Sequence, residues 1–419
     1  MRPLLPRGWR RSVDVLPSAV GRVVDRELCT GCGGCVQLDD RITMGDVRGF
    51  RRPIVDPGAG ARDTRAAART FRRMCPGISV TAPRPDGARR DRTLGPVLAL
   101  RRAWAVAPEV RHAGSSGGTL TALVGWLVER DGSGPCVASS GGASDPRTTV
   151  PVRITTRDEA FATAGSRYAP VSVAAHPATT DPAATVVCKP CEASALRRLA
   201  EIEGREPPLL LTFFCAGTPS QRATDDLVTT LGMPAEAVLE SVRYRGRGWP
   251  GRFVARSVDG AEVSTDYRTS WGAHLGPHVQ WRCRTCPDGV GESGDLSAGD
   301  LWDTDDEGYP SFAEAPGTSA LVVRTARGRA LLDEAVAAGV LEVEPVEAET
   351  VVAAQPYQAH RRRLLLPRLV ATLVLRRAVT RARGFGILGS AARAPRAALR
   401  ELRGTVVRLR YRDREGIRS

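Results

Sequence analysis

The sequence predicts an α/β fold with additional α+β elements, organised around a parallel sheet. Two short apolar runs, at 186–191 and 209–217, each end in a sharp turn at proline or glycine. A helical pattern of apolar residues follows each run, at 195–202 and at 227–231. A strand, a turn and a helix, repeated in that order, are typical of βαβ units in a parallel sheet.

A cysteine lies at the end of each of these two predicted strands, and together the cysteines predict a binding site. Cys191 and Cys215 stand at the carboxyl ends of the two predicted strands. Open α/β sheets build their binding sites at this edge. Cys283 and Cys286 form a C-x-x-C pair in a predicted loop further along the chain. The four thiols could therefore converge at one edge of the sheet.

Charge is distributed unevenly along the 419 residues. The segment 357–419 carries 17 arginines and 3 acidic residues, which accounts for the whole net charge of +14. The remaining chain holds 43 basic and 43 acidic residues, and Lys189 is its only lysine. A neutral body with 5% aromatic residues does not indicate a nucleic-acid-binding protein.

The ten cysteines are not preceded by a secretory signal, because residues 1–28 contain arginine but no continuous apolar region. No apolar run reaches the length of a membrane-spanning helix. We therefore expect a cytoplasmic protein whose cysteines have metal or redox roles rather than disulfide roles.

The first cysteine motif is a tight triplet, Cys29, Cys32 and Cys35, on a glycine-rich loop, followed by a distant Cys75 before proline. This spacing lets four thiolates wrap one 4Fe–4S cluster. Asp39 stands where a two-cluster ferredoxin would place its next cysteine, so we expect a single cluster here. Structural zinc is the alternative, but zinc usually takes two separated pairs.

A serine- and glycine-rich turn precedes a predicted amphipathic helix at 120–128. It consists of Ser115, Ser116, Gly117, Gly118 and Thr119. Either serine could cap the helix, and the glycines would let a planar ligand or a phosphate approach the backbone. A plain capped helix behind a turn explains the pattern equally well.

Two further loops leave their role open. The turn 244–251 combines arginines, glycines and a tryptophan, which suits either an anion clamp or a solvated hairpin. The acidic stretch 291–302 predicts a carboxylate-rich surface loop more readily than a metal site. Cys188 lies inside a predicted strand and Cys136 is expected in the core, so neither is assigned a ligand role.

These motifs together resemble the coenzyme F420 hydrogenase/dehydrogenase β-subunit family, which includes the 7-hydroxymethyl chlorophyll a reductases. The resemblance spans roughly residues 22–370. Its motifs, besides the ferredoxin-like cysteines and the Ser115–Thr119 turn, are Gly165-Ser166-Arg167-Tyr168, Lys189-Pro190-Cys191, Phe214-Cys215-Ala216-Gly217-Thr218-Pro219-Ser220, Arg282-Cys283-x-x-Cys286-Pro287-Asp288 and Gly299-Asp300-x-Trp302.

Members of that family are iron–sulfur flavoproteins. The resemblance implies FAD and a core 4Fe–4S cluster, which makes two clusters with the N-terminal one. It carries over Cys191, Cys215, Cys283 and Cys286 as ligands of the core cluster. It also implies a flavin pocket formed by the turn 115–119 together with Ser166 and Tyr168. No catalytic residue is assigned.

The expected organisation has four parts. They are an N-terminal arm (1–21), a ferredoxin-like iron–sulfur segment (22–90), a flavin-binding α/β core with FAD and iron–sulfur (95–356) and a basic helical tail (357–419). We expect an FAD-dependent oxidoreductase that exchanges electrons between the clusters, FAD and a small molecule. Coenzyme F420 is a candidate substrate. The electron donor is expected to be ferredoxin, reduced F420 or another donor, and the direction of electron flow is left open. A non-catalytic electron-transfer subunit is the main alternative, and a zinc-bound nucleic-acid module is disfavoured.

The tail is open to two interpretations. Leu365, Leu369 and Leu373 share a helical face beside many arginines, which suits a helix that lies on an anionic membrane surface or docks an acidic partner. The same face would suit a helix packed on the core. Beyond residue 384, glycines and a proline break the pattern, and packing on the core is not expected.

Overall fold

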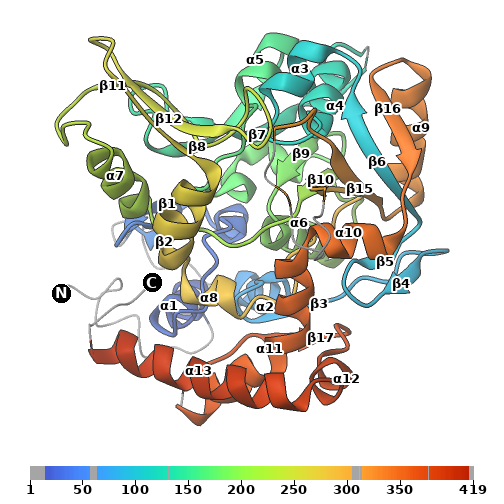
Figure 1. Cartoon of the computed structure of the whole chain (residues 1–419). Coiled ribbons are helices and arrows are strands. Elements are labelled where there is room, and N and C mark those ends of the chain that lie inside the picture. Colours follow the sequence, from blue (N-terminus) through green and yellow to red (C-terminus); the bar gives the residue numbers. More distant parts are fainter. Residues whose placement is uncertain are drawn as a thin grey trace.

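The computed structural model describes residues 15–56, 64–130, 132–303, 311, 314–375 and 377–414. An eight-stranded mixed sheet in the order β16-β6-β15-β14-β10-β9-β7-β8 forms its centre (Figure 1). The strands are β6 (Ala99–Ala105), β7 (Cys136–Gly141), β8 (Thr149–Ile154), β9 (Thr185–Cys188), β10 (Leu209–Phe213), β14 (Leu296–Asp300), β15 (Ser319–Val323) and β16 (Leu341–Pro345).

The predicted βαβ unit is present at the middle of this sheet. β9 and β10 are parallel, and α6 (Pro190–Glu203) connects them. β7 is also parallel to β9, and β14 is parallel to β10. The remaining pairs of the sheet, β7 with β8, β14 with β15, β15 with β6 and β6 with β16, are antiparallel. The second predicted repeat is interrupted, because after α7 (Gln221–Thr230) the chain builds a separate antiparallel sheet before it returns as β14. The sheet is therefore mixed rather than purely parallel.

Both faces of the central sheet are covered by helices, because successive residues of its inner strands are apolar and point to opposite sides. Leu211 and Leu296 pack with Leu123 of α4 (Thr119–Val128) and Leu332 of α9 (Ala326–Ala337). On the opposite face, Val186 and Leu210 pack with Leu196 of α6. This burial of apolar surface is the main stabilising contribution to the fold.

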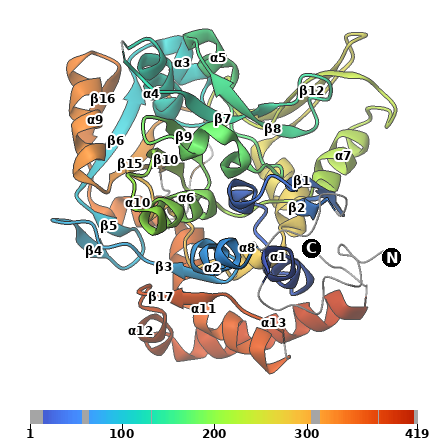
Figure 2. The same cartoon turned by 180° about the vertical axis from the view of Figure 1, so that it is seen from behind.

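The N-terminal segment forms a small packed unit of α1 (Leu16–Asp25), the β1–β2 hairpin (Ile42–Val47, Phe50–Val55) and α2 (Arg65–Met74). Leu16, Ala19 and Val20 are buried, so the described end of the expected arm belongs to a core helix. α1 thus continues across the expected boundary between residues 21 and 22, and residues 1–14 lie outside the described part of the chain. Figures 1 and 2 show this unit between the central sheet and the C-terminal helices.

Shorter elements complete the described chain. They are η2 (Gly34–Leu38), β3 (Ser79–Thr81), β4 (Arg89–Asp91), β5 (Gly95–Val97), α3 (Pro108–Ala113), α5 (Arg157–Ala162), η3 (Val173–Ala175), η4 (Pro177–Thr180), β11 (Leu239–Arg243), β12 (Arg252–Ser257), β13 (Glu262–Asp266), η5 (Arg268–Leu275), η6 (Gly276–His278), α8 (Trp281–Arg284) and α10 (Ala348–Ala354).

The basic tail is packed against the body rather than separate from it. It contains α11 (Pro356–Val374), β17 (Arg381–Arg383), α12 (Ile387–Ala392) and α13 (Pro395–Arg414). Leu365 and Leu369 of α11 are buried, whereas Leu373 is 54% exposed. β17 pairs with β3 of the N-terminal segment.

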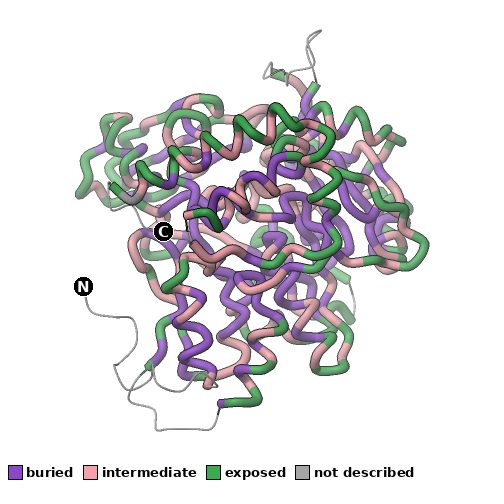
Figure 3. Tube along the Cα trace, turned by 90° about the horizontal axis from the view of Figure 1, so that it is seen from below, coloured by how far each residue is buried: buried purple, intermediate pink, exposed green. Residues whose placement is uncertain are grey.

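Residues beyond 384 also pack, contrary to the sequence-based expectation. α13 lies along α11 and buries Thr405 and Leu409 completely. The view from below in Figure 3 shows buried chain inside a rim of exposed segments. Residues 415–419 lie outside the described part. No helix among the described residues combines the length and the apolar character that crossing a membrane requires.

Candidate functional site

The first cysteine set lies in the N-terminal segment. Cys29, Cys32 and Cys35 occupy the loop that enters η2, and Cys75 directly follows α2. All four line one small cavity of about 20 Å³. Gly33 makes the tight winding of this loop possible, because its φ is +88° and a Cβ atom there would lie 2.7 Å from the Cβ of Ala175.

The environment of this first set is unfavourable for isolated thiolates. Burial raises the pKa of Cys32 to about 11, and burial also raises the pKa of Cys35 and Cys75. The charges of the other cysteines in the set raise these values further, which places the four thiols within electrostatic range of one another. A bound metal centre would offset this repulsion, since a coordinated thiol is deprotonated.

The second cysteine set is assembled from three segments. Cys191 lies in the first turn of α6, Cys215 two residues after β10, and Cys283 and Cys286 in and after α8. The amide of Cys215 donates to the carbonyl of Gly289 at 2.8 Å, which joins two of these segments. Burial, followed by the charge of Cys283, raises the pKa of Cys215 to about 12. Cys191 is within electrostatic range of Cys215, and Cys215 is within range of Cys283 and Cys286. Their joint role as ligands of one cluster stays a prediction.

Gly217 allows this close approach. Its φ of +126° is left-handed, and a Cβ atom there would lie 3.1 Å from the Cβ of Cys283. Among the described residues, no three His, Cys, Asp or Glu side chains converge as on a single metal ion. The thiolates of a 4Fe–4S cluster bind different iron atoms, so they need not meet at one point.

The two cysteine sets are neighbours. Cys32 and Cys191 pack into one apolar cluster with Met74 and Leu199. Residues next to the C-x-x-C pair also contact the backbone beside the first set. Gln280 donates to the carbonyl of Thr30 at 3.1 Å, and Arg282 donates to the carbonyl of Pro76 at 2.7 Å. These contacts join the N-terminal segment to the central sheet.

A cavity of about 530 Å³ opens beside the second set. The predicted ligand-binding residues Ser115, Ser116, Gly118, Thr119, Ser166 and Tyr168 all line it. Gly117 does not line it, and its role beside a ligand stays a prediction. A Cβ atom on Gly117 would collide with the carbonyl oxygen of Ala103, so this glycine is needed for packing against β6.

Neither serine of the turn 115–119 caps α4, although the sequence suggested that one of them could. α4 begins after Gly118, and no side chain caps it. Ser116 instead donates to the carbonyl of Thr318 at 2.8 Å, and the hydroxyl groups of Ser115 and Ser166 lie 2.6 Å apart. These bonds hold the turn open against the neighbouring loop and leave polar atoms along the cavity wall.

Arg245 is a cavity residue whose position the sequence did not reveal. It lies in the turn expected to be a solvated hairpin or an anion clamp, but it is only 1% exposed. Its guanidinium pairs with Asp300 at 2.6 Å and lies 4.6 Å from the ring centre of Tyr267 and 5.2 Å from that of Trp302. The stretch 291–302 is correspondingly an interior element rather than a surface loop.

Lys189 places a positive charge between the cavity and the second set. Its Nζ donates to the carbonyl of Val171 at 2.6 Å and pairs with Glu192 at 2.8 Å. Burial lowers the pKa of Lys189, but Glu192, Cys191 and Cys215 raise it by more, so the side chain stays charged. Two signals in the sequence pointed to it: Lys189 is the only lysine, and it begins the Lys189-Pro190-Cys191 motif of the family resemblance.

Family models match most of this architecture. Residues 101–176 match the model for the coenzyme F420 hydrogenase/dehydrogenase β-subunit N-terminal region, and residues 183–349 match the one for its C terminus. The chain belongs to this β-subunit family. The resemblance inferred from the motifs is thereby confirmed. Residues 23–81 of this family member match a 4Fe–4S single-cluster domain, and that range contains the whole first cysteine set.

A solved structure supports the same fold for this β-subunit family member. The match is a chain in "Xenon derivatization of the F420-reducing NiFe hydrogenase complex from Methanosarcina barkeri". It has 19% sequence identity and a TM-score of 0.51, and the alignment covers 67% of this chain and 96% of the other. No curated protein matches. The family and the 4Fe–4S domain identify an iron–sulfur redox protein that transfers electrons.

Proposed function

We propose that the chain is an FAD-dependent iron–sulfur oxidoreductase with two 4Fe–4S clusters. The first set, Cys29, Cys32, Cys35 and Cys75, would hold one cluster. The second set, Cys191, Cys215, Cys283 and Cys286, would hold the other. FAD would occupy the 530 Å³ cavity, whose size lies within the range usual for ligand and cofactor sites.

The observation that carries this proposal is the double role of Cys215. It belongs to the second cysteine set and also lines the large cavity. Cys191 of the same set packs against Cys32 of the first set. These contacts support an electron path from the first cysteine set through the second set to the cavity, because they place neighbouring sites close together.

The cavity residues suit a flavin. The aromatic side chains of Tyr168, Tyr267 and Trp302 offer flat apolar surface for a ring system. Buried Arg245 has one terminal nitrogen without a hydrogen-bond partner among the described residues, and Lys189 adds a second fixed cation. Such groups bind and orient a polar ring edge while the aromatic wall excludes water.

When bound, a flavin supplies two-electron hydride chemistry, and iron–sulfur clusters supply single-electron transfer. The protein's own contribution is to place Cys215 against the ligand cavity and to keep a positive charge at Lys189. We propose coenzyme F420 as the small-molecule substrate because of the family to which the chain belongs. The direction of electron flow follows from the potential of the donor.

An acidic electron-donor protein such as ferredoxin is the partner that the tail suits best. Arg396, Arg400, Arg403 and Arg410 of α13 are exposed, beside exposed Val407. Opposite charge on a partner would raise the association rate and make it sensitive to salt. Binding to anionic vesicles instead of the protein donor would identify a peripheral membrane contact.

The test begins with anaerobic purification of the full chain, followed by iron, sulfide and flavin analysis. We expect about eight iron and about eight sulfide per chain from two Cys₄-bound clusters, with one FAD. The isolated chain should then exchange electrons between an artificial dye and F420. Full cofactor content without any turnover would instead identify a non-catalytic electron-transfer subunit.

A further inference from the structure

Helix α11 covers the second cysteine set, although it lies beyond the residues that match the family models. Three of its side chains bind the loop that follows β10. Tyr357 donates to the carbonyl of Ala216 at 3.1 Å, and Arg361 donates to the same carbonyl at 2.7 Å. Gln358 donates to the carbonyl of Cys215 at 3.4 Å. The tail therefore begins as a part of the redox site.

Arg361 is the charged residue in this contact, and its hydrogen bonding is incomplete. The residue is only 3% exposed. Its Nε atom is buried and has no hydrogen-bond partner among the described residues. A buried, unsatisfied donor on a guanidinium is costly unless a bound group accepts from it. This unused donor therefore indicates a ligand near Arg361.

The position of Gly289 shows where Arg361 lies. A Cβ atom on Gly289 would be 2.6 Å from Nη1 of Arg361 and would also collide with Oε1 of Gln358. Gly289 follows Cys286 by three residues, and its carbonyl accepts from the amide of Cys215 at 2.8 Å. The guanidinium thus lies where the loops that carry Cys215 and Cys286 meet.

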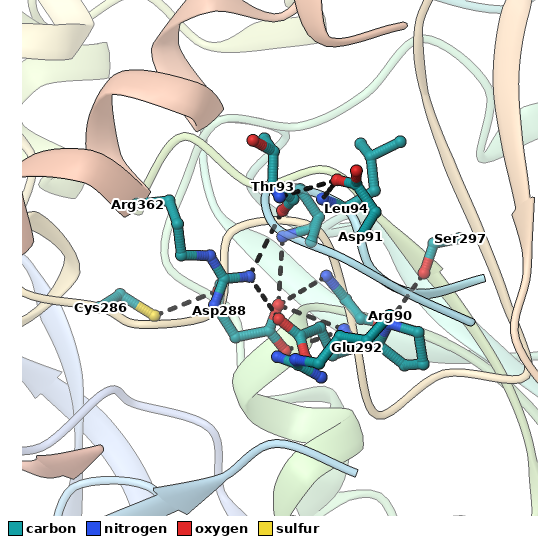
Figure 4. A network of polar contacts seen from close by, with 12 residues as sticks. Arg90, Asp91, Thr93, Leu94, Cys286, Asp288, Glu292, Ser297 and Arg362 are labelled. Carbon is teal, nitrogen blue, oxygen red and sulfur yellow. Dashed lines mark hydrogen bonds and ion pairs between the residues drawn. The ribbon is translucent and has the colours of Figure 1, made fainter. Parts of the chain in front are cut away.

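A buried ionic network fixes α11 in this position (Figure 4). Arg362, the next residue, forms an ion pair with Glu292, which also pairs with Arg90 at 2.8 Å. Asp288 accepts from the amide of Gly291 at 2.8 Å and so shapes the loop after Cys286. Arg90 is exposed, but Arg362 and Glu292 are buried, so their ion pair holds the turn of α11 that carries Arg361 beside the cysteine-bearing loops.

We propose that Arg361 is a positioning residue that holds a fixed positive charge against the second cysteine set and raises the reduction potential of the cluster bound there. Reduction adds one negative charge to the site, and a nearby cation stabilises the more negative state. The inference rests on the proposed function because it requires that cluster. It adds a segment outside the matched family residues to the electron path.

The test is an anaerobic redox titration of the full chain, followed by electron paramagnetic resonance, with Arg361→Gln. The potential of one cluster should shift to lower values, and that of the first-set cluster should stay unchanged. Arg361→Lys keeps a positive charge and should shift less. Arg363→Gln is the matched control, since it removes the same charge from an exposed position on the same helix and should leave both potentials unchanged.

A second variant covers the case in which Arg361→Gln fails to bind its cluster. Gln358→Glu would place a carboxylate beside Arg361 and compensate its charge, so the same potential should fall. The hydrogen bond that Arg361 donates to Ala216 remains, whereas the one from Gln358 to the carbonyl of Cys215 is lost. An unchanged potential in a cluster-loaded Arg361→Gln or Gln358→Glu protein overturns the inference. If the wild-type chain binds only the first-set cluster, the proposed function itself fails, and iron analysis distinguishes that outcome.

Discussion

The two cysteine sets present similar ligands on very different supports. The first set comes from one stretch of chain, residues 29–75, wound by a glycine-rich loop. The second set is contributed by two strand ends and a distant loop, and Gly217, Gly289 and α11 bring these together. The difference indicates that the first set is a local module, whereas the second is a product of the complete fold. Loss of a ligand should therefore have unequal consequences.

The largest expected effect separates the two sets directly. Cys283→Ser should remove the second cluster and weaken the junction of Cys215 with the 283–286 loop, and it should also reduce FAD content. Cys32→Ser should remove only the first cluster and leave FAD bound. Iron analysis should show about half the wild-type content in each variant, since each set holds one four-iron cluster. Equal loss of FAD in both variants would contradict the comparison.

The next effect tests the ion pair beside the second set. Lys189→Met would leave the carboxylate of Glu192 buried without its cation. Breaking a buried pair in this way costs about 3–5 kcal/mol, which should appear as a lower midpoint in denaturant unfolding. The double variant Lys189→Met/Glu192→Gln should recover part of that stability. An equally unstable double variant would show that the charge pair is not the cause.

Substitution of a cavity residue should have a smaller and more specific effect, limited to FAD binding. Ser115→Phe would place a ring in the cavity and should displace FAD while both clusters remain bound, as absorbance after anaerobic reconstitution would show. Gly117→Val is the comparison variant. Because its side chain would collide with the backbone of Ala103, it should lower the unfolding midpoint as well. Retention of FAD by the Ser115→Phe variant would refute the proposal that FAD binds in this cavity.

The smallest expected effect concerns helix α13, which packs against α11. Glu401 of α13 accepts from Arg368 of α11 at 2.8 Å and from Arg408 at 2.6 Å. Glu401→Gln should cost about 0.5–1 kcal/mol, because the pair is partly exposed to solvent. Burial raises the pKa of Glu401, but Arg368 and Arg408 lower it by more, to below its ordinary value of 4.5.

The sign of the pH dependence follows from that lowered pKa. A depressed folded-state pKa contributes stability above pH 4.5, and this contribution is lost as the pH falls through the folded-state value. Wild type and Glu401→Gln should thus differ in unfolding free energy at pH 7 and converge under acidic conditions. A difference that persists below the folded-state pKa would show that Glu401 acts through hydrogen bonding of the neutral group rather than through its charge.

Sequence patterns predicted the parts of the site that depend on local order. The spacing of Cys29, Cys32 and Cys35 is readable because one loop carries all three. The apolar runs predicted where β9 and β10 end, and this placed Cys191 and Cys215 at the carboxyl edge of the sheet. Local patterns describe neither the return of the chain through β11–β13 nor the mixed sheet that results.

The buried charged residues were not predictable for the same reason. Arg245 was expected in a polar turn because its neighbours are glycines, but its partner Asp300 lies 55 residues away. Arg361 was assigned to a solvated or partner-binding tail, because an arginine-rich helix usually faces water. Its burial follows from contacts with loops near residues 216 and 289, which only the folded chain brings together.

The parallel pairing of β3 with β17 has a consequence for biosynthesis. It joins residues 79–81 to residues 381–383, so β3 gains this partner strand only after residues 82–380 have been made. At the usual elongation rate, the interval between the two strands is roughly 15–60 s. During that time the edge of β3 that pairs with β17 has no partner strand in the nascent chain. This part of the N-terminal segment should therefore complete its folding only after residues 381–383 have left the ribosome.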